Sequence, residues 1–158
     1  GHYCAKEVTG VDISAFACEF ATENARLNGL ENVVHFVEAN AFDLLAEQSR
    51  AGVKYDVVIL DPPAFTKTRS AIEAATRGYK EINLRAMKMV KPGGYLITCS
   101  CSQHILPDAF MQIVRDAAHD AHVQLRQVEY RTQGRDHPIL PAAPETQYLK
   151  CGIFQIFD

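Results

Sequence analysis

Two cysteines, Cys99 and Cys101, stand one residue apart at the end of the apolar run "YLITCSC". Side chains two residues apart on a strand lie on the same face, with about 6.6 Å between their alpha carbons. A cysteine acts as a nucleophile through its thiolate, and a free thiol has a pKa of about 8.5, so a nucleophilic cysteine needs activation. Buried cysteines are usually inert. The pair is therefore either a nucleophile at a strand end or two small core residues.

The segment "VVILDPPAF" places an acid, two prolines and an aromatic residue after a second apolar run. The prolines fix the backbone directly after the predicted strand and remove two N–H groups. Asp61 and the neighbouring carbonyl groups would then face a ligand, with Phe65 near enough to stack on a planar ring. The alternative is an ordinary turn.

Polar residues also end two earlier apolar runs, at Asp12 and at Asn40. An acid that ends the strand before a helix can accept hydrogen bonds from both hydroxyls of a cofactor ribose. Asp12 fits that role, although a capping or solvated aspartate would look the same in the sequence.

These residues depend on strands and helices that alternate along the chain. Strands are expected at 7–13, 32–40, 55–61, 95–101, 124–131 and 148–157. Helices are expected at 14–28, 42–50, 70–90 and 107–121. This order predicts an α/β fold with a mainly parallel sheet and an antiparallel final pair. Because ligands bind outside the carboxyl ends of such strands, the sequence predicts a site that includes Asp12, Asn40, Asp61 and Cys101.

The composition fits one globular domain of ordinary size, with 158 residues, 47% hydrophobic and 22% charged. A net charge of -3 argues against nucleic-acid binding by bulk electrostatics, so any such contact would be local. The five cysteines include no Cys-x-x-Cys pair, and no metal site is expected. The sequence shows no signal peptide or membrane span, which indicates a cytoplasmic protein.

The motif "DPPAF" resembles the fourth motif of class I S-adenosylmethionine-dependent methyltransferases that modify nucleobases. The runs "GYKEINLRAMKMVKPGGYLITCSCSQH" and "RDHPILPAAPETQYLK" are similar to the bacterial family of 5-methylcytosine methyltransferases acting on large-subunit ribosomal RNA. The resemblance implies a Rossmann-like methyltransferase sheet. Methyltransferases of exocyclic amino groups on guanine or adenine also carry an acid-Pro-Pro motif, and they remain an alternative.

The resemblance implies that Cys101 is the nucleophile, which adds to carbon 6 of cytosine so that carbon 5 can accept a methyl group. Asp61 would hydrogen-bond the amine and ring edge of that base. The residues implied to bind S-adenosylmethionine are Asp12, Ile13, Asn40, Ala41, Phe42 and Asp61. Those implied to bind the ribosomal RNA are Pro62, Pro63, Phe65 and Lys67.

The family's usual first strand and glycine-rich turn do not occur in this sequence, so residues 1–158 are expected to be a partial methyltransferase domain. The missing strand normally lies between the strands predicted at 7–13 and 55–61, and its loss would expose two sheet edges. Those two strands would then pair directly, or a second copy would cover them in a homodimer. Weak cofactor binding is expected, and a catalytically silent oligomerising fragment is a further alternative.

Overall fold

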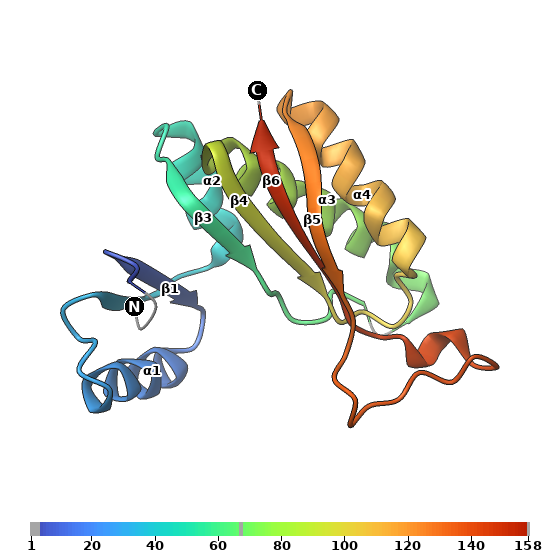
Figure 1. Cartoon of the computed structure of the whole chain (residues 1–158), viewed down its shortest axis with the longest axis horizontal. Coiled ribbons are helices and arrows are strands. Elements are labelled where there is room, and N and C mark those ends of the chain that lie inside the picture. The colour runs from blue at the N-terminus through green and yellow to red at the C-terminus, as the bar shows by residue number, and fades with distance from the viewer. Residues whose placement is uncertain (1–3, 67, 158) are drawn as a thin grey trace. The chain divides into compact units, whose positions relative to one another are not determined.

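The computed structural model describes residues 4–66 and 68–157, and it divides the chain into two units, Gly1–Glu47 and Gln48–Asp158. Each unit has its own sheet, with two strands in the first and four in the second (Figure 1). Across the described residues, no helix combines the length and the apolar character needed to cross a membrane. A single partial domain over residues 1–158 stays a prediction.

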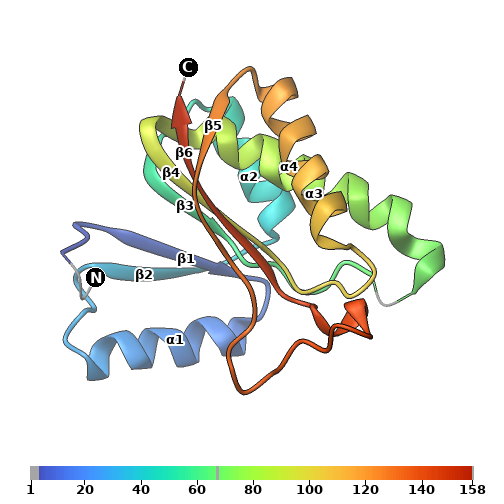
Figure 2. The same ribbon diagram turned by 45° about the vertical axis from the view of Figure 1, so that its right-hand side comes forward.

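The first unit pairs two parallel strands through a helical crossover. β1 (Val8–Asp12) and β2 (Val34–Glu38) run in register, with Asp12 opposite Glu38. α1 (Ala15–Leu27) connects them and lies beside both strands in Figure 2. This is the strand-helix-strand arrangement predicted for this part of the sequence.

The boundaries of α1 follow from its capping residues. Ser14 is the N-cap, and its hydroxyl oxygen accepts a hydrogen bond from the Ala17 N–H at 3.2 Å. Gly29, just beyond the helix, has a φ of +65°, in the left-handed region that favours glycine. The predicted helix at 14–28 is therefore confirmed, and so is the one at 42–50, which is α2 (Ala41–Arg50).

The second unit contains a sheet with the strand order β3-β4-β6-β5. Its strands are β3 (Tyr55–Leu60), β4 (Val90–Ser100), β5 (Gln124–Arg131) and β6 (Lys150–Phe157). Its helices are α3 (Ile72–Met89) and α4 (Pro107–Ala121), with short 3-10 turns at Arg69–Ala71 and Pro144–Thr146. Figures 1 and 2 show α3 and α4 on one face of this sheet.

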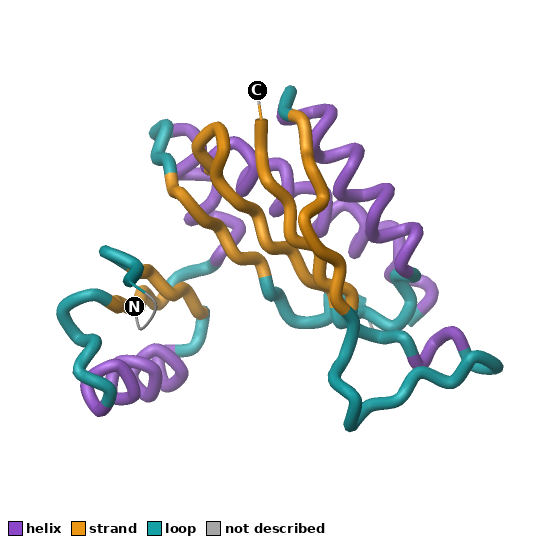
Figure 3. The backbone as a smooth tube through the Cα atoms, in the orientation of Figure 1, coloured by secondary structure: helices purple, strands orange, loops and turns teal. Residues whose placement is uncertain are grey.

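β6 is the strand that breaks the parallel order. β3 is parallel to β4, whereas β6 is antiparallel to β4 on one side and to β5 on the other. The four strands lie side by side in the backbone trace (Figure 3). The predicted α/β sheet, mostly parallel with an antiparallel C-terminal strand, is confirmed.

The core of the second unit lies between the sheet and its two helices. The largest buried side chains include Tyr79 on α3, Phe110 on α4 and Leu96 on β4. Towards the end of β4 the buried face becomes polar, because Thr98 and Ser100 are 0% exposed. Polar groups at this depth need hydrogen-bond partners, so the end of β4 is chemically distinct from the rest of the core.

β4 begins earlier than the sequence predicts. The pattern predicts a strand from residue 95, but pairing starts at Val90 opposite Tyr55 and resumes at Tyr95 opposite Val57. The irregularity is possible because Gly93 has a φ of +81° and Gly94 has no Cβ, which would lie 2.7 Å from the Asp56 carbonyl oxygen.

β1 and β3 belong to different sheets, so the prediction that these strands pair directly is wrong. β1 pairs with β2 and packs against α1, whereas β3 pairs with β4 in the sheet that packs against α3 and α4. β3 is an edge strand of its sheet, and its side chains Val57 and Ile59 are 48% and 63% exposed.

Candidate active site

Asp61 and Cys101 directly follow the neighbouring parallel strands β3 and β4. Ile59 is level with Ile97, so the same register places Asp61 level with Cys99. Side chains at alternate positions share a face, which puts the acid on the face of the sheet that carries Cys99. The Asp61 carboxylate contributes to a raised pKa of Cys99, which supports this proximity.

The two cysteines differ in their surroundings. Cys99 is 9% exposed and lies opposite Cys151 on β6. Burial, reinforced by a hydrogen bond with the Cys151 thiol, raises the pKa of Cys99 to about 12. Cys99 is therefore a protonated thiol at neutral pH. Cys101, by contrast, is half-buried and lies just outside the strand.

Buried polar residues hold the backbone on both sides of Cys101. The Ser102 N–H donates to the Ser100 hydroxyl oxygen at 3.3 Å, and the hydroxyls of Ser102 and Tyr79 are hydrogen-bonded at 2.8 Å. The Lys150 ammonium donates to the Ser102 carbonyl oxygen at 2.7 Å. Cys101 thus stands on a segment fixed by α3 and β6.

Sequence reasoning missed Lys150. The signal that could have found it is the alternation in "LKCGIFQIF". Lys150 lies on the same face of the strand as Gly152, Phe154 and Ile156, and all four residues are buried. A lysine in the buried phase of a strand is unusual and calls for an explanation.

The segment after Asp61 packs against α3. The Phe65 ring lies 4.5 Å from the Tyr79 ring, centroid to centroid, at an angle of 37°. Pro62 is half-buried and Pro63 is exposed. Lys67 lies outside the described residues. Contact of these residues with RNA stays a prediction, and packing on Tyr79 gives Phe65 a structural role as well.

In the first unit, Asp12 and Asn40 lie at the carboxyl ends of paired strands, where the Ala39 N–H donates to the Asp12 carbonyl oxygen at 2.9 Å. Asp12 Oδ1 accepts from the Ser14 N–H at 2.8 Å, and Asn40 Oδ1 accepts from the Phe42 N–H at 2.9 Å. Both side chains are exposed. One oxygen of each already accepts a backbone N–H at the start of the following helix, α1 for Asp12 and α2 for Asn40.

Apolar and small side chains flank these two polar residues. Ile13 is 73% exposed and Phe42 is 39% exposed, and Ala41 is exposed as well. In the part of the chain that the structure describes, Asp12 Oδ2 makes no hydrogen bond. This oxygen and the exposed apolar groups could accept a ribose hydroxyl and contact a planar base.

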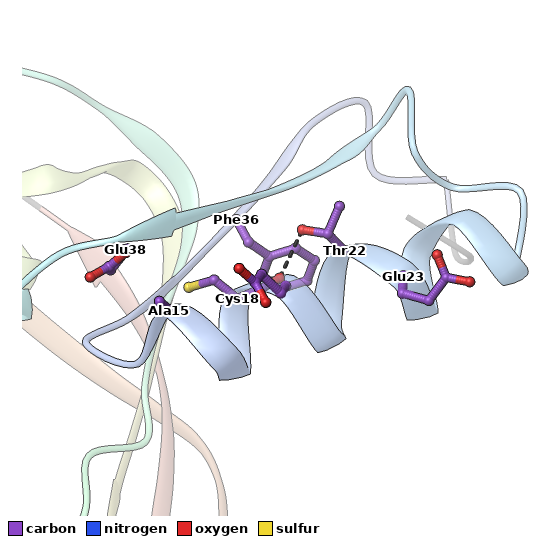
Figure 4. A pocket seen from close by; sticks show the side chains of 7 residues that line it. Ala15, Cys18, Thr22, Glu23, Phe36 and Glu38 are labelled. Carbon is purple, nitrogen blue, oxygen red and sulfur yellow. Dashed lines mark hydrogen bonds between the residues drawn. The ribbon is translucent and has the colours of Figure 1, made fainter.

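A hollow of about 410 Å³ lies between α1 and β2 of the first unit (Figure 4). It is lined by Ala15, Cys18, Glu19, Thr22, Glu23, Phe36 and Glu38. A second hollow of similar size lies at the start of β3 and β4, away from their carboxyl ends. Neither contains a predicted site residue, and the three glutamates of the first would repel a phosphate group. The described residues include no group of three metal-ligating side chains that could hold an ion.

A family model described as "Methyltransferase domain" matches residues 3–144. The chain belongs to the methyltransferase domain family. This finding and the fold confirm the predicted class I S-adenosylmethionine-dependent methyltransferase domain.

Curated relatives of this methyltransferase domain carry the name Ribosomal RNA large subunit methyltransferase I. The one from Shewanella denitrificans is 43% identical over 155 residues, which cover 95% of this chain and 39% of the relative. The one from Aeromonas hydrophila is 45% identical over 147 residues, covering 92% of this chain and 37% of the relative. The chain therefore spans about two fifths of the length of these relatives.

Solved structures share the fold at low sequence identity. SMU.776, a methyltransferase solved in complex with SAH, has a TM-score of 0.81 at 16% identity, covering 94% of this chain and 39% of its own. NSun6 from Pyrococcus horikoshii, solved with SFG, has a TM-score of 0.65 at 20% identity, covering 94% and 41%. The predicted Rossmann-like methyltransferase fold is confirmed by these likenesses.

Proposed function

We propose that this methyltransferase domain modifies carbon 5 of a cytosine in large-subunit ribosomal RNA, with Cys101 as a covalent nucleophile. The observation that supports this most is the position of Asp61 and Cys101, which directly follow the adjacent parallel strands β3 and β4. The names of the curated relatives support the ribosomal RNA substrate, which would place the enzyme in the cytoplasm.

The contrast between the two cysteines supports the choice of nucleophile. Cys99 is buried and its pKa of about 12 keeps it protonated, whereas Cys101 is half-exposed. The Cys101 thiolate would form a bond to carbon 6 of cytosine, and the electron pair displaced from the ring would make carbon 5 nucleophilic. After carbon 5 accepts the methyl group, a base removes its proton, the ring double bond re-forms, and the thiolate leaves.

Asp61 would orient the base during these steps. Its carboxylate can accept hydrogen bonds from the exocyclic amine and from a protonated ring nitrogen, which favours the adduct. Pro62 and Pro63 would line the site, with Phe65 and Lys67 as further contacts to RNA. The target base must leave its stack, at a cost of a few kcal/mol that is smallest in single-stranded RNA.

S-adenosylmethionine would supply the methyl group as an electrophile attached to sulfur. Asp12 fits the ribose through Oδ2, which its turn leaves available, and Ile13 and Phe42 offer exposed apolar surface for the adenine. Asn40 Oδ1 already accepts from Phe42, but a carbonyl oxygen has a second lone pair for the adenine amine. Ala41 and Asp61 are the remaining residues proposed to contact S-adenosylmethionine.

A cytosine carrying fluorine at carbon 5 provides the test, because a base cannot remove fluorine and the adduct should persist. We expect the full-length protein to form an RNA adduct that survives denaturing electrophoresis. Cys101→Ala should abolish it, whereas the matched Cys99→Ala should retain it. A methylated exocyclic amine without any adduct, detected by nucleoside mass spectrometry, would instead identify the amino-group methyltransferase. The catalytically silent alternative is tested by cofactor titration of residues 1–158 against a version extended upstream, and it predicts binding by the extended version alone.

A homodimer formed through the β3 edge is part of the proposal. The observation that supports it is an edge strand with exposed Val57 and Ile59. An apolar edge with unpaired backbone groups is a ready partner for a second strand.

A further inference from the structure

Lys150 is a lysine at 0% exposure on β6, opposite Ser100 of β4. Burial of a charged group is unfavourable unless other groups compensate it. In the described part of the chain no carboxylate forms an ion pair with Lys150. A leucine or methionine at this position would be buried at a lower cost in free energy, so a role for the ammonium group is expected.

The hydrogen bonds of Lys150 converge on the segment that carries Cys101. Its Nζ donates to the Ser102 carbonyl oxygen at 2.7 Å and to the Tyr148 carbonyl oxygen at 2.7 Å. The first of these oxygens belongs to the residue directly after Cys101. The ammonium therefore fixes the backbone next to the proposed nucleophile and brings a positive charge close to it.

Burial lowers the pKa of Lys150 to about 8, while the negative charge of the Cys101 thiolate acts in the opposite direction. Lys150 is thus still mostly protonated at pH 7. A positive charge that the hydrogen bonds to the Ser102 and Tyr148 carbonyl oxygens hold next to Cys101 attracts a negative charge at that position.

Other titratable side chains around this end of the sheet come from every neighbouring element. They are Cys99 on β4, Asp61 after β3, Tyr79 on α3, Asp108 on α4, Tyr130 on β5 and Cys151 on β6. Of the charged groups among these described side chains, Cys101 is the one whose negative charge opposes the lowering of the Lys150 pKa by burial.

We infer that Lys150 is a positioning residue for Cys101, which holds the backbone after the cysteine through the Ser102 carbonyl and favours its thiolate by charge. The thiol proton passes to solvent, and Lys150 keeps its own. The inference rests on the proposed role of Cys101 as nucleophile. It adds the group that prepares this nucleophile before RNA is bound.

Alkylation of Cys101 tests the charge effect without RNA or methyl transfer. The full-length protein is treated with iodoacetamide from about pH 6 to about pH 10, and the Cys101 peptide is quantified by mass spectrometry. Lys150→Met should move the alkylation profile to higher pH and slow the reaction of Cys101 at pH 7 by about threefold or more, because a nearby positive charge is lost. The exposed Lys88→Met is the matched control and should leave the profile unchanged. An unchanged midpoint in folded Lys150→Met would overturn the inference.

A second measurement keeps Lys150 in place, in case Lys150→Met does not fold. The side-chain carbon signal of Lys150 is titrated by NMR in the wild-type protein and in Cys101→Ser. The midpoint, expected near the pKa of about 8, should fall when the thiolate is removed. Identical midpoints would refute the coupling.

These outcomes are separate from the test of function. A fluorocytosine adduct with an unmoved alkylation profile would reject only the role of Lys150. A shifted profile without any adduct would reject the proposed reaction and leave the coupling between Lys150 and Cys101 intact.

Discussion

Cys99 and Cys151 lie directly opposite each other on β4 and β6, and after burial the Cys151 thiol contributes most to the raised pKa of Cys99. The surroundings of a buried thiol determine its pKa and therefore its reactivity. Cys99 is buried and lies near the Asp61 carboxylate, so its charged form is disfavoured. Cys101 follows two residues later, outside the strand and beside a buried ammonium.

The first prediction concerns thiol reactivity in the native protein. Because the pKa of Cys99 is raised to about 12, less than about one part in a thousand of it should be thiolate at pH 8. Peptide-resolved alkylation at that pH should therefore label Cys101 at least tenfold faster than Cys99. Denatured protein, in which both thiols are exposed, is the control and should lose the difference. Equal rates in the native state would contradict the assignment.

Tyr79→Phe should destabilise the protein by about 1–3 kcal/mol, because it leaves the buried Ser102 hydroxyl without its partner at 2.8 Å. Urea unfolding measures the change. The matched control is Tyr55→Phe, which removes a half-buried hydroxyl bonded to Gln48 and should cost less. If the two substitutions have equal effects, the Tyr79 hydroxyl does not stabilise the segment after β4.

Sequence patterns predicted most of the elements because local signals determine them. Ser14 and Gly29 delimit α1, and Pro107 begins α4 at its first turn. Within the second unit, Asp61 and Cys101 follow the neighbouring parallel strands β3 and β4, whose carboxyl ends lie at the same edge of their sheet. That Asp61 lies level with Cys99 was not predicted from the sequence, because that placement depends on the register of β3 against β4.

Other features depend on contacts between distant residues and could not be read from local patterns. The early start of β4 requires the backbone of Gly94 to approach Asp56. The stacking of Phe65 on Tyr79 and the bonds of Lys150 to Ser102 join segments that are far apart in the sequence. The prediction that β1 pairs directly with β3 is wrong, because β1 pairs with β2 and β3 pairs with β4.

Asp12→Asn tests the proposed ribose contact while it preserves the turn. The amide keeps an oxygen for the Ser14 N–H, but it loses the charge that strengthens bonds to ribose hydroxyls. Calorimetry with S-adenosylhomocysteine and the full-length protein should show binding weaker by about tenfold. Asp43→Asn, an exposed acid in the first turn of α2, is the control. Unaltered affinity in Asp12→Asn would remove Asp12 from the cofactor site.

Ile59→Lys tests the proposed homodimer at the β3 edge. A lysine on an edge strand opposes pairing with another strand, because association would have to desolvate its charge. Light scattering of this chain over a wide range of concentration should show a dimer for the wild type and a monomer for Ile59→Lys. Val128→Lys places the same charge on β5, the opposite edge of the same sheet, at 56% exposure, and should leave the dimer intact. A wild-type monomer at all concentrations would exclude the dimer, and loss of the dimer in Val128→Lys instead would move the interface to β5.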